Sequence, residues 1–171
     1  MDETVEKINP NDILFYAIKT GNSGILFYSL NSNACVNAVE KDWSWTALMF
    51  AVINKQKHIV NLLIEKGADV NAMDKNNRTA LMFAVSSGCK DIVKLLVMNG
   101  ARINDADNNG ITALMIAAVT GNIDLVEFLV EKNAALNAKD SFGKTALFHA
   151  IKNERFVIAR YLLDEMEKQK A

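Results

Sequence analysis

Few side chains in this 171-residue sequence have the chemistry of a catalyst or a metal ligand. Its two histidines are His58 and His149, and its two cysteines are Cys35 and Cys89; these residue types serve as general bases, nucleophiles and zinc ligands. The cysteines lie 54 residues apart without a C-x-x-C motif, and neither histidine has an evident nucleophile as its partner. No G-x-S-x-G, Walker A or H-E-x-x-H motif occurs either. We therefore expect no enzymatic activity, no metal site and no cofactor.

The charge of the sequence argues against a nucleic acid or a membrane as partner. It has 19 Lys and Arg residues and 20 Asp and Glu residues, so the formal net charge is −1, and no basic cluster stands out. Phosphate backbones and anionic lipids are attracted by positive fields, which this composition does not supply. Half of the residues are hydrophobic and 23% are charged, which is typical of a folded protein. With one proline and eight glycines, the composition favours helices over tight β-turns.

The N-terminal residues predict a cytoplasmic location. The first seven, M-D-E-T-V-E-K, are acidic and no apolar stretch follows them, unlike the start of a signal peptide. No window approaches the roughly 18 consecutive apolar residues of a membrane-spanning helix. Both observations favour the reducing cytoplasm, where cysteines stay unpaired. Export as an effector without a cleavable signal stays open.

A repeat of 33 residues organises the chain. The tetrad T-A-L-M, or T-A-L-F in the last copy, occurs at residues 46–49, 79–82, 112–115 and 145–148. A second landmark, an aliphatic residue followed by Asn, has the same spacing at 70–71, 103–104 and 136–137. Because two separate landmarks share one period, the repeat belongs to a whole structural unit.

Each copy reads as two short helices and a turn. The Thr can cap a first helix, which we expect over about residues 80–87 in one copy and 113–120 in the next. A second helix follows, with apolar residues at helical spacing, and it ends at Gly67, Gly100 or Asn133, residues that tolerate a left-handed backbone. A polar stretch such as 72–78 then forms a protruding turn. Since no single unit can cover its own apolar surfaces, the units must stack.

Residues 107–118 (D-N-N-G-I-T-A-L-M-I-A-A) and 121–126 (G-N-I-D-L-V) resemble the ankyrin repeat. Two departures are systematic: Ala replaces Pro at 47, 80, 113 and 146, and Met or Phe replaces His at 49, 82, 115 and 148. The resemblance implies an all-α solenoid of about five helix-turn-helix units in one domain. We expect a degenerate N-terminal capping unit at 1–41, internal units at 42–73, 74–106 and 107–139, and a C-terminal capping unit at 140–171. A column of Met49, Met82, Met115 and Phe148 should fill the layer between the units.

The resemblance also implies that the turns and the first helices line a concave surface that binds another protein. The side chains expected there are Trp43, Trp45, Phe50, Lys75, Asn76, Arg78, Phe83, Ile111, Ile116, Phe142, Lys144 and His149. Both tryptophans occupy turn positions where a solvated loop would carry polar residues. Two interpretations stay open: the indoles anchor a partner, which Lys75, Arg78 and Lys144 orient, or the indoles fold onto neighbouring turns and complete the core.

A self-associating scaffold is the alternative function, using the aromatic groove or the last helix. We expect a monomer, with a homo-oligomer left open. The polar residues 164–170, which stand where the pattern has Gly-Ala, suggest a closing cap. We expect the repeated asparagines to hydrogen-bond local backbone in their turns; they are Asn37, Asn71, Asn104 and Asn137.

Overall fold

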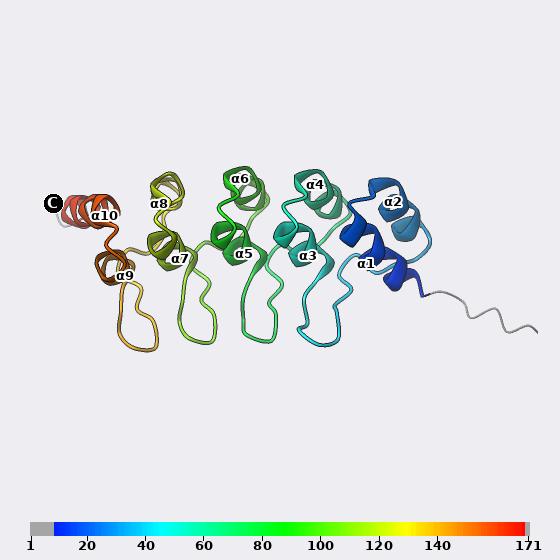
Figure 1. Ribbon diagram of the computed structural model, residues 1–171, viewed down its shortest axis with the longest axis horizontal. Coiled ribbons are helices and arrows are strands. Elements are labelled where there is room, and N and C mark those ends of the chain that lie inside the picture. Colours follow the sequence, from blue (N-terminus) through cyan, green and yellow to red (C-terminus); the bar gives the residue numbers. More distant parts are fainter. Residues whose placement is uncertain (1–8, 170–171) are drawn as a thin grey trace, which may run out of the picture.

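The computed structural model describes residues 9–169, which form ten α-helices in five antiparallel pairs. The first helices of the pairs are α1 (Pro10–Thr20), α3 (Ala47–Ile53), α5 (Ala80–Ser86), α7 (Ala113–Thr120) and α9 (Ala146–Lys152). The second helices are α2 (Ser23–Asn31), α4 (Lys57–Glu65), α6 (Lys90–Met98), α8 (Ile123–Glu131) and α10 (Phe156–Lys168). The pairs stand side by side in chain order, and the long turns project together from one side (Figure 1). The all-α solenoid predicted from the repeat is confirmed.

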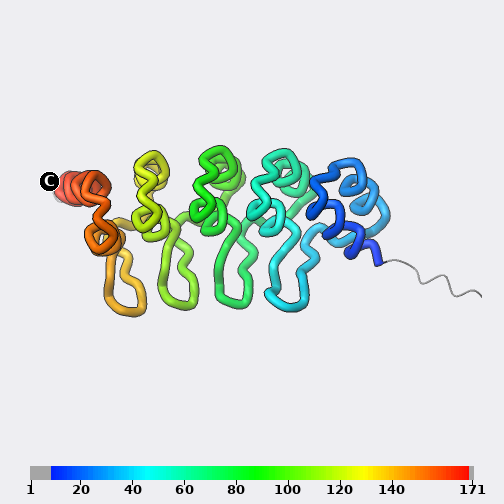
Figure 2. Tube along the Cα trace, viewed as in Figure 1, coloured from blue at the N-terminus to red at the C-terminus, as the bar shows by residue number. Residues whose placement is uncertain are grey.

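The turns between the pairs are hairpin-like loops that run alongside one another (Figure 2). Isolated antiparallel bridges close the first three loops at their base, and they pair Val39 with Thr46, Met73 with Thr79, and Ala106 with Thr112. The described residues form no longer strand. These three loops are therefore closed next to the first helices that follow them.

The helices are short, and packing between pairs must stabilise them. Three of the first helices have seven residues, and the longest helix of the fold, α10, has 13. Isolated helices below about 12–15 residues are marginal in water. None of the helices within residues 9–169 is both long and apolar enough to cross a lipid bilayer.

The repeated threonines cap the first helices, as predicted. Thr46 Oγ1 accepts a hydrogen bond from the backbone N–H of Met49 (3.2 Å), and Thr112 Oγ1 accepts one from Met115 (3.4 Å). Thr79 and Thr145 make the same bond in their own units. This satisfies one of the backbone donors that every helix N-terminus leaves unpaired.

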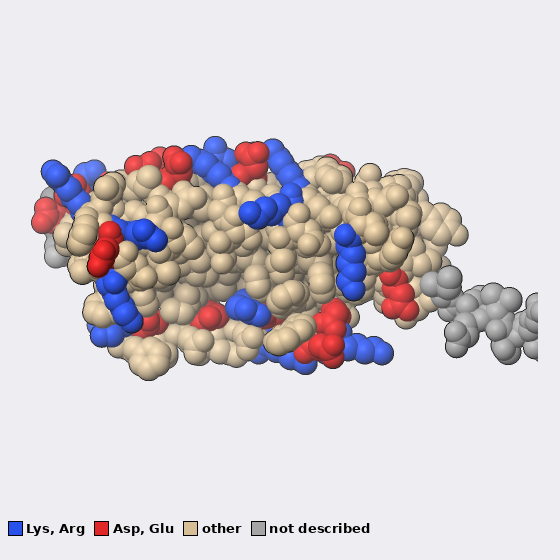
Figure 3. All heavy atoms as spheres, viewed as in Figure 1, with Lys and Arg blue, Asp and Glu red and all other residues tan. Residues whose placement is uncertain are grey.

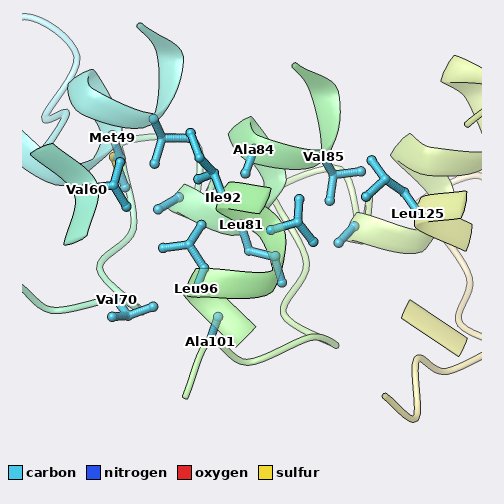
Figure 4. Packing of buried hydrophobic residues seen from close by; sticks show 14 of the residues in the cluster. Met49, Val60, Val70, Leu81, Ala84, Val85, Ile92, Leu96, Ala101 and Leu125 are labelled. Atoms are coloured by element: carbon cyan, nitrogen blue, oxygen red, sulfur yellow. The ribbon is translucent and has the colours of Figure 1, made fainter. Parts of the chain in front are cut away.

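The core is a continuous layer of apolar side chains that runs between successive units. Figure 4 shows residues from neighbouring pairs meeting in it, among them Met49, Leu81, Ile92 and Leu125. The methionines of the repeated tetrad, Met49, Met82 and Met115, are buried as expected. Their flexible thioethers fill the layer that joins one pair to the next.

The last unit departs from this pattern. Phe148 stands at the position of Met115, yet it is 40% exposed, because no described helix pair follows α9 and α10 to cover it. The polar residues that follow Leu163 continue α10, which ends at Lys168. Ile151 of α9 is exposed as well, at 51%. The final unit therefore presents apolar side chains at the C-terminal end of the stack.

The repeated asparagines link units, which corrects the expectation that they bond local backbone. Asn71 Oδ1 accepts the backbone N–H of Arg102 (2.8 Å), and Asn71 Nδ2 donates to the carbonyl oxygen of Gly100 (3.0 Å). Asn104 makes the corresponding pair of bonds one unit later, and Asn37 accepts the N–H of Asp69. Each bond spans about one repeat of sequence, so these side chains hold adjacent units in register.

Candidate partner-binding surface

An acidic residue organises each of the four turns. Asp74 Oδ1 accepts hydrogen bonds from the backbone N–H groups of Asn76 and Arg78, both at 2.8 Å. Carboxylates in the other three turns make equivalent bonds, and these belong to Glu40, Asp107 and Asp140. Charge-assisted bonds of this kind are stronger than neutral ones, so they give the turn tips a defined shape. The sequence reasoning missed this role, although the acidic position recurs every 33 residues at 74, 107 and 140.

Neighbouring turns are also bonded to each other. The backbone N–H of Asn108 donates to the carbonyl oxygen of Asn76 (2.9 Å), and that of Ser141 donates to the carbonyl oxygen of Asn109 (2.8 Å). Lys75 is exposed, but its ammonium donates to the backbone carbonyl of Asp42 in the preceding turn. The turn tips therefore form one continuous edge of the molecule.

An aromatic cluster occupies the N-terminal half of this surface. The ring of Trp45 lies 5.4 Å, centroid to centroid, from both Phe50 and Phe83, in edge-to-face contacts. Phe15 of α1 continues the cluster, 5.5 Å from Phe50. Phe15 was not among the predicted surface residues. In the degenerate first unit it occupies the position that Met49 holds in the second unit. Through Phe50 and the indole of Trp45, the cluster links side chains of three successive first helices.

Trp45 and Arg78 are both engaged by the buried carboxylate of Asp74. Trp45 Nε1 donates to Asp74 Oδ2 (3.1 Å), and Arg78 pairs with the same oxygen through Nε (2.9 Å) and a terminal guanidinium nitrogen (2.7 Å). The guanidinium also lies 4.8 Å from the ring centroid of Phe83. Burial raises the pKa of Asp74, but the hydrogen bonds from Arg78, Asn76 and Trp45 outweigh it, so the pKa lies below its ordinary value.

The other tryptophan is placed differently. Trp43 lies at the tip of the first turn, with its ring 6.2 Å from that of Trp45, and is 57% exposed. The structure thus divides the two indoles: Trp45 packs between units and is half-buried, whereas Trp43 stands largely in solvent.

A second cluster lies at the C-terminal half of the surface, on the last turn and α9. His149 Nε2 is 2.8 Å from Asp140 Oδ2, and Lys144 Nζ is 4.0 Å from the ring centroid of Phe148. Phe142, at the turn tip, is 81% exposed. Burial raises the pKa of Asp140, but bonds from the Lys144 N–H, His149 and the Phe142 N–H outweigh it and lower the pKa overall.

These side chains surround an open hollow of about 670 Å³. Its walls also include Asn109, Ile111 and Lys152. Ile111 and Ile116 are half-buried between the two clusters and line a smaller hollow with His149. The predicted residues therefore share one side of the molecule, but they gather as two clusters joined by an aliphatic stretch.

Figure 3 shows where charged side chains lie on one side of the molecule. In the view of Figure 3, Lys, Arg, Asp and Glu side chains gather mainly along the edge of the second helices and along the turns. The band between these two edges is mostly uncharged (Figure 3).

Comparison with known proteins agrees with this architecture. The sequence matches the family described as "Ankyrin repeats (3 copies)" over residues 14–107 and 103–171. It is 38% identical over 71 residues to M-phase phosphoprotein 8 of Mus musculus, and likewise to M-phase phosphoprotein 8 of Homo sapiens. Each alignment covers 41% of this chain and 8% of the relative, so the chain spans a small part of the length of these relatives. With the family pattern extending over most of its length, the chain belongs to the ankyrin-repeat family.

Proposed function

We propose that the chain binds a partner protein on the surface formed by its turn tips and first helices, with Trp43 and Phe142 as anchors. Ankyrin repeats are generally protein–protein interaction modules. The observation that carries the proposal is the exposure of these two rings, at 57% and 81%, on turns that buried or half-buried carboxylates hold in place. Aromatic side chains, Phe among them, are enriched at the centres of protein interfaces, and Trp is over-represented among the residues that dominate binding energy.

The rest of the surface supplies the floor and the polar contacts of the site. Trp45, Phe50 and Phe83 form a packed aromatic floor beside Trp43, while Ile111 and Ile116 continue the apolar surface toward the second cluster. Lys144 and Lys152 border the hollow beneath Phe142 and favour acidic groups on the partner. A rigid, preorganised surface loses little entropy when the partner binds.

Binding rather than catalysis is the function we assign. The His149 imidazole is paired with Asp140, a carboxylate that already serves the structure of its turn. Residues 9–169 contain no group of three His, Cys, Asp or Glu side chains able to hold a metal ion. We further propose that the protein works as a cytoplasmic module without nucleic-acid or membrane partners, since its charges are balanced and its cysteines, Cys35 and Cys89, are free thiols.

Affinity capture with a matched pair of variants tests this proposal. The full chain is used as bait in lysate of the source cells, and the retained proteins are quantified by mass spectrometry. Trp43→Ala combined with Phe142→Ala should lose the specific partner, whereas Met98→Ala, which truncates an exposed side chain on α6, should retain it. Equal thermal midpoints would show that both variants are folded. Retention of the same proteins by the double variant and by the wild type would refute the proposal.

A further inference from the structure

The C-terminal end of the stack has the character of an interface between units. Phe148 and Ile151 occupy the repeat positions of Met82 and Val85, which the following unit buries. Leu163 of α10 occupies the position of Val97, which packs against the core, yet Leu163 is 45% exposed. Positions that are buried or partly buried in the preceding units are therefore exposed in the last described unit.

The polar links between units also stop at this end. Asn71 and Asn104 each bond the backbone of the unit that follows. Asn137 holds the same repeat position, but it is exposed and makes no side-chain hydrogen bond within residues 9–169. The end face thus combines the amide of Asn137, which has no side-chain hydrogen bond within residues 9–169, with exposed apolar side chains.

Helix α10 carries an exposed stripe on the side that faces away from α8. Phe156, Arg160, Leu163 and Glu167 are spaced by four, three and four residues, so they share one helix face, and all four are exposed. Tyr161 lies on the opposite side of α10. Burial is the main reason why its pKa is raised, and the negative charges of Glu165 and of Glu127 and Glu131 in α8 raise the pKa further. The stripe therefore continues the end face formed by Phe148 and Ile151.

The charges along α10 match an antiparallel copy of themselves. Arg160 lies toward the N-terminal half of the helix, and Asp164 and Glu167 lie toward its C-terminal end. Lys168 is already paired with Glu165, at 2.6 Å. A second α10 running in the opposite direction, with the two Leu163 side chains at the centre, brings each Arg160 near Asp164 and Glu167 of the other copy. A head-to-tail arrangement lacks this match, since α2 of the first unit carries no charged residue to pair with Arg160, Asp164 and Glu167.

We propose that the C-terminal end face binds the same face of a second copy of this chain in a two-fold symmetric dimer. Phe148, Ile151, Phe156 and Leu163 form its apolar centre, and Arg160 pairs with Asp164 and Glu167 across its rim. An isologous contact of this kind closes after two copies and does not propagate into a fibre. The net charge of −1 gives the copies no long-range repulsion. The contact includes Phe148, which also borders the hollow of the proposed partner-binding surface, whereas Trp43 and the aromatic cluster around Trp45 lie in the N-terminal half of the stack.

Sedimentation equilibrium on the full chain over about a hundredfold range of concentration tests the dimer. We expect the mass to rise with concentration to twice the 18.9 kDa of the chain and no further. Leu163→Glu should weaken the dimer at least about tenfold, equivalent to about 1.4 kcal/mol. Met98→Glu places the same charge on an exposed side chain of α6 and should change nothing. Monomer at every concentration, masses that grow beyond the dimer, or a dimer unaffected by Leu163→Glu would each overturn the proposal.

Charge exchange provides a second test that does not alter the apolar centre. Arg160→Glu should weaken self-association, whereas Lys94→Glu, at the same repeat position in α6, should not. The combination Asp164→Lys and Glu167→Lys should also weaken it. Mixing the Arg160→Glu chain with the double-lysine chain should restore a dimer of the two. A mixture that dimerises no better than its two components would contradict the antiparallel pairing. The helical circular dichroism of each variant reports whether it is folded.

Discussion

Trp45 donates its indole N–H to the carboxylate of Asp74 at 3.1 Å, and this bond crosses the boundary between two repeat units. The same carboxylate shapes its own turn through two backbone N–H groups and pairs with Arg78. The buried carboxylate of Asp74 thus connects the aromatic cluster around Trp45 with the turn of the following unit. An indole with this role is part of the framework, whereas its neighbour Trp43 is largely exposed to solvent.

The two tryptophans should therefore differ in their effect on stability. Trp45→Phe keeps an aromatic ring but removes a hydrogen bond to a buried carboxylate, so we expect a loss of about 1.5–3 kcal/mol in the free energy of unfolding. Trp43→Phe, at an exposed turn tip, should change it by less than about 0.5 kcal/mol. Urea denaturation followed by circular dichroism measures both values. Equal losses for the two variants would show that the bond to Asp74 contributes nothing.

Acid should destabilise the fold in part through Asp74. Because its folded-state pKa is lowered, the unfolded chain takes up the proton first, and the stabilisation is present above the unfolded-state pKa. It is lost as the pH falls from about 4 through the folded-state pKa. Asp74→Asn should be less stable than wild type near neutrality but lose less stability between neutral and acid pH. Urea denaturation of the wild type and of Asp74→Asn at neutral and acid pH measures the difference, and an equal loss of stability in the two chains would contradict the prediction.

The asparagines that link units offer a matched comparison within one chain. Asn71→Ala removes two hydrogen bonds to the next unit and should cost about 1–2 kcal/mol. Asn137→Ala changes the same repeat position in the last unit and should cost less than about 0.5 kcal/mol. Chemical denaturation of the two variants in parallel gives the difference. If Asn137→Ala were as costly as Asn71→Ala, the stabilisation would come from local turn structure instead.

Two glycines at equivalent turn positions should respond unequally to alanine. Gly110 and Gly143 both have a positive φ, +75° and +73°, so Ala adds backbone strain of about 1 kcal/mol at either site. At Gly110 the new Cβ would also lie 2.9 Å from Cα of Asp140 in the next turn, whereas at Gly143 nothing lies within 4 Å. We expect Gly110→Ala to be less stable than Gly143→Ala by about 1 kcal/mol or more, because inserting an atom into a packed site has a cost of this order. Thermal unfolding of the two variants measures this difference. Equal midpoints would show that the turns move apart to accommodate the new Cβ, and would contradict the prediction.

The sequence was sufficient for the features that depend on nearby residues or on periodicity. The 33-residue spacing predicted the stacked helical pairs, and Thr46 and Thr112 predicted the helix caps that the structure contains. The left-handed helix ends at Gly67 and Asn133 also follow from their residue types, with φ of +87° and +64°. A cap or a helix end involves only a few consecutive residues, so the local pattern is enough to identify it.

The candidate surface was predictable only in outline. The sequence placed its residues on the turns and first helices, but it left open which tryptophan is packed and did not reveal the roles of Asp74 and Asp140. Trp45 and Asp74 are 29 residues apart, and which indole reaches the carboxylate depends on how one unit lies against the next.

What the sequence by itself determined is the repeating unit: its two helices, its capped start and the necessity of stacking. Only the tertiary structure decided that the asparagines bond across units, that Trp45 is framework while Trp43 is exposed, and that Phe148 is uncovered. The physical reason is that identical residue types acquire different environments from their neighbours in space. Met115 is buried because another pair of helices follows it, and Phe148 is exposed because none does within the described residues.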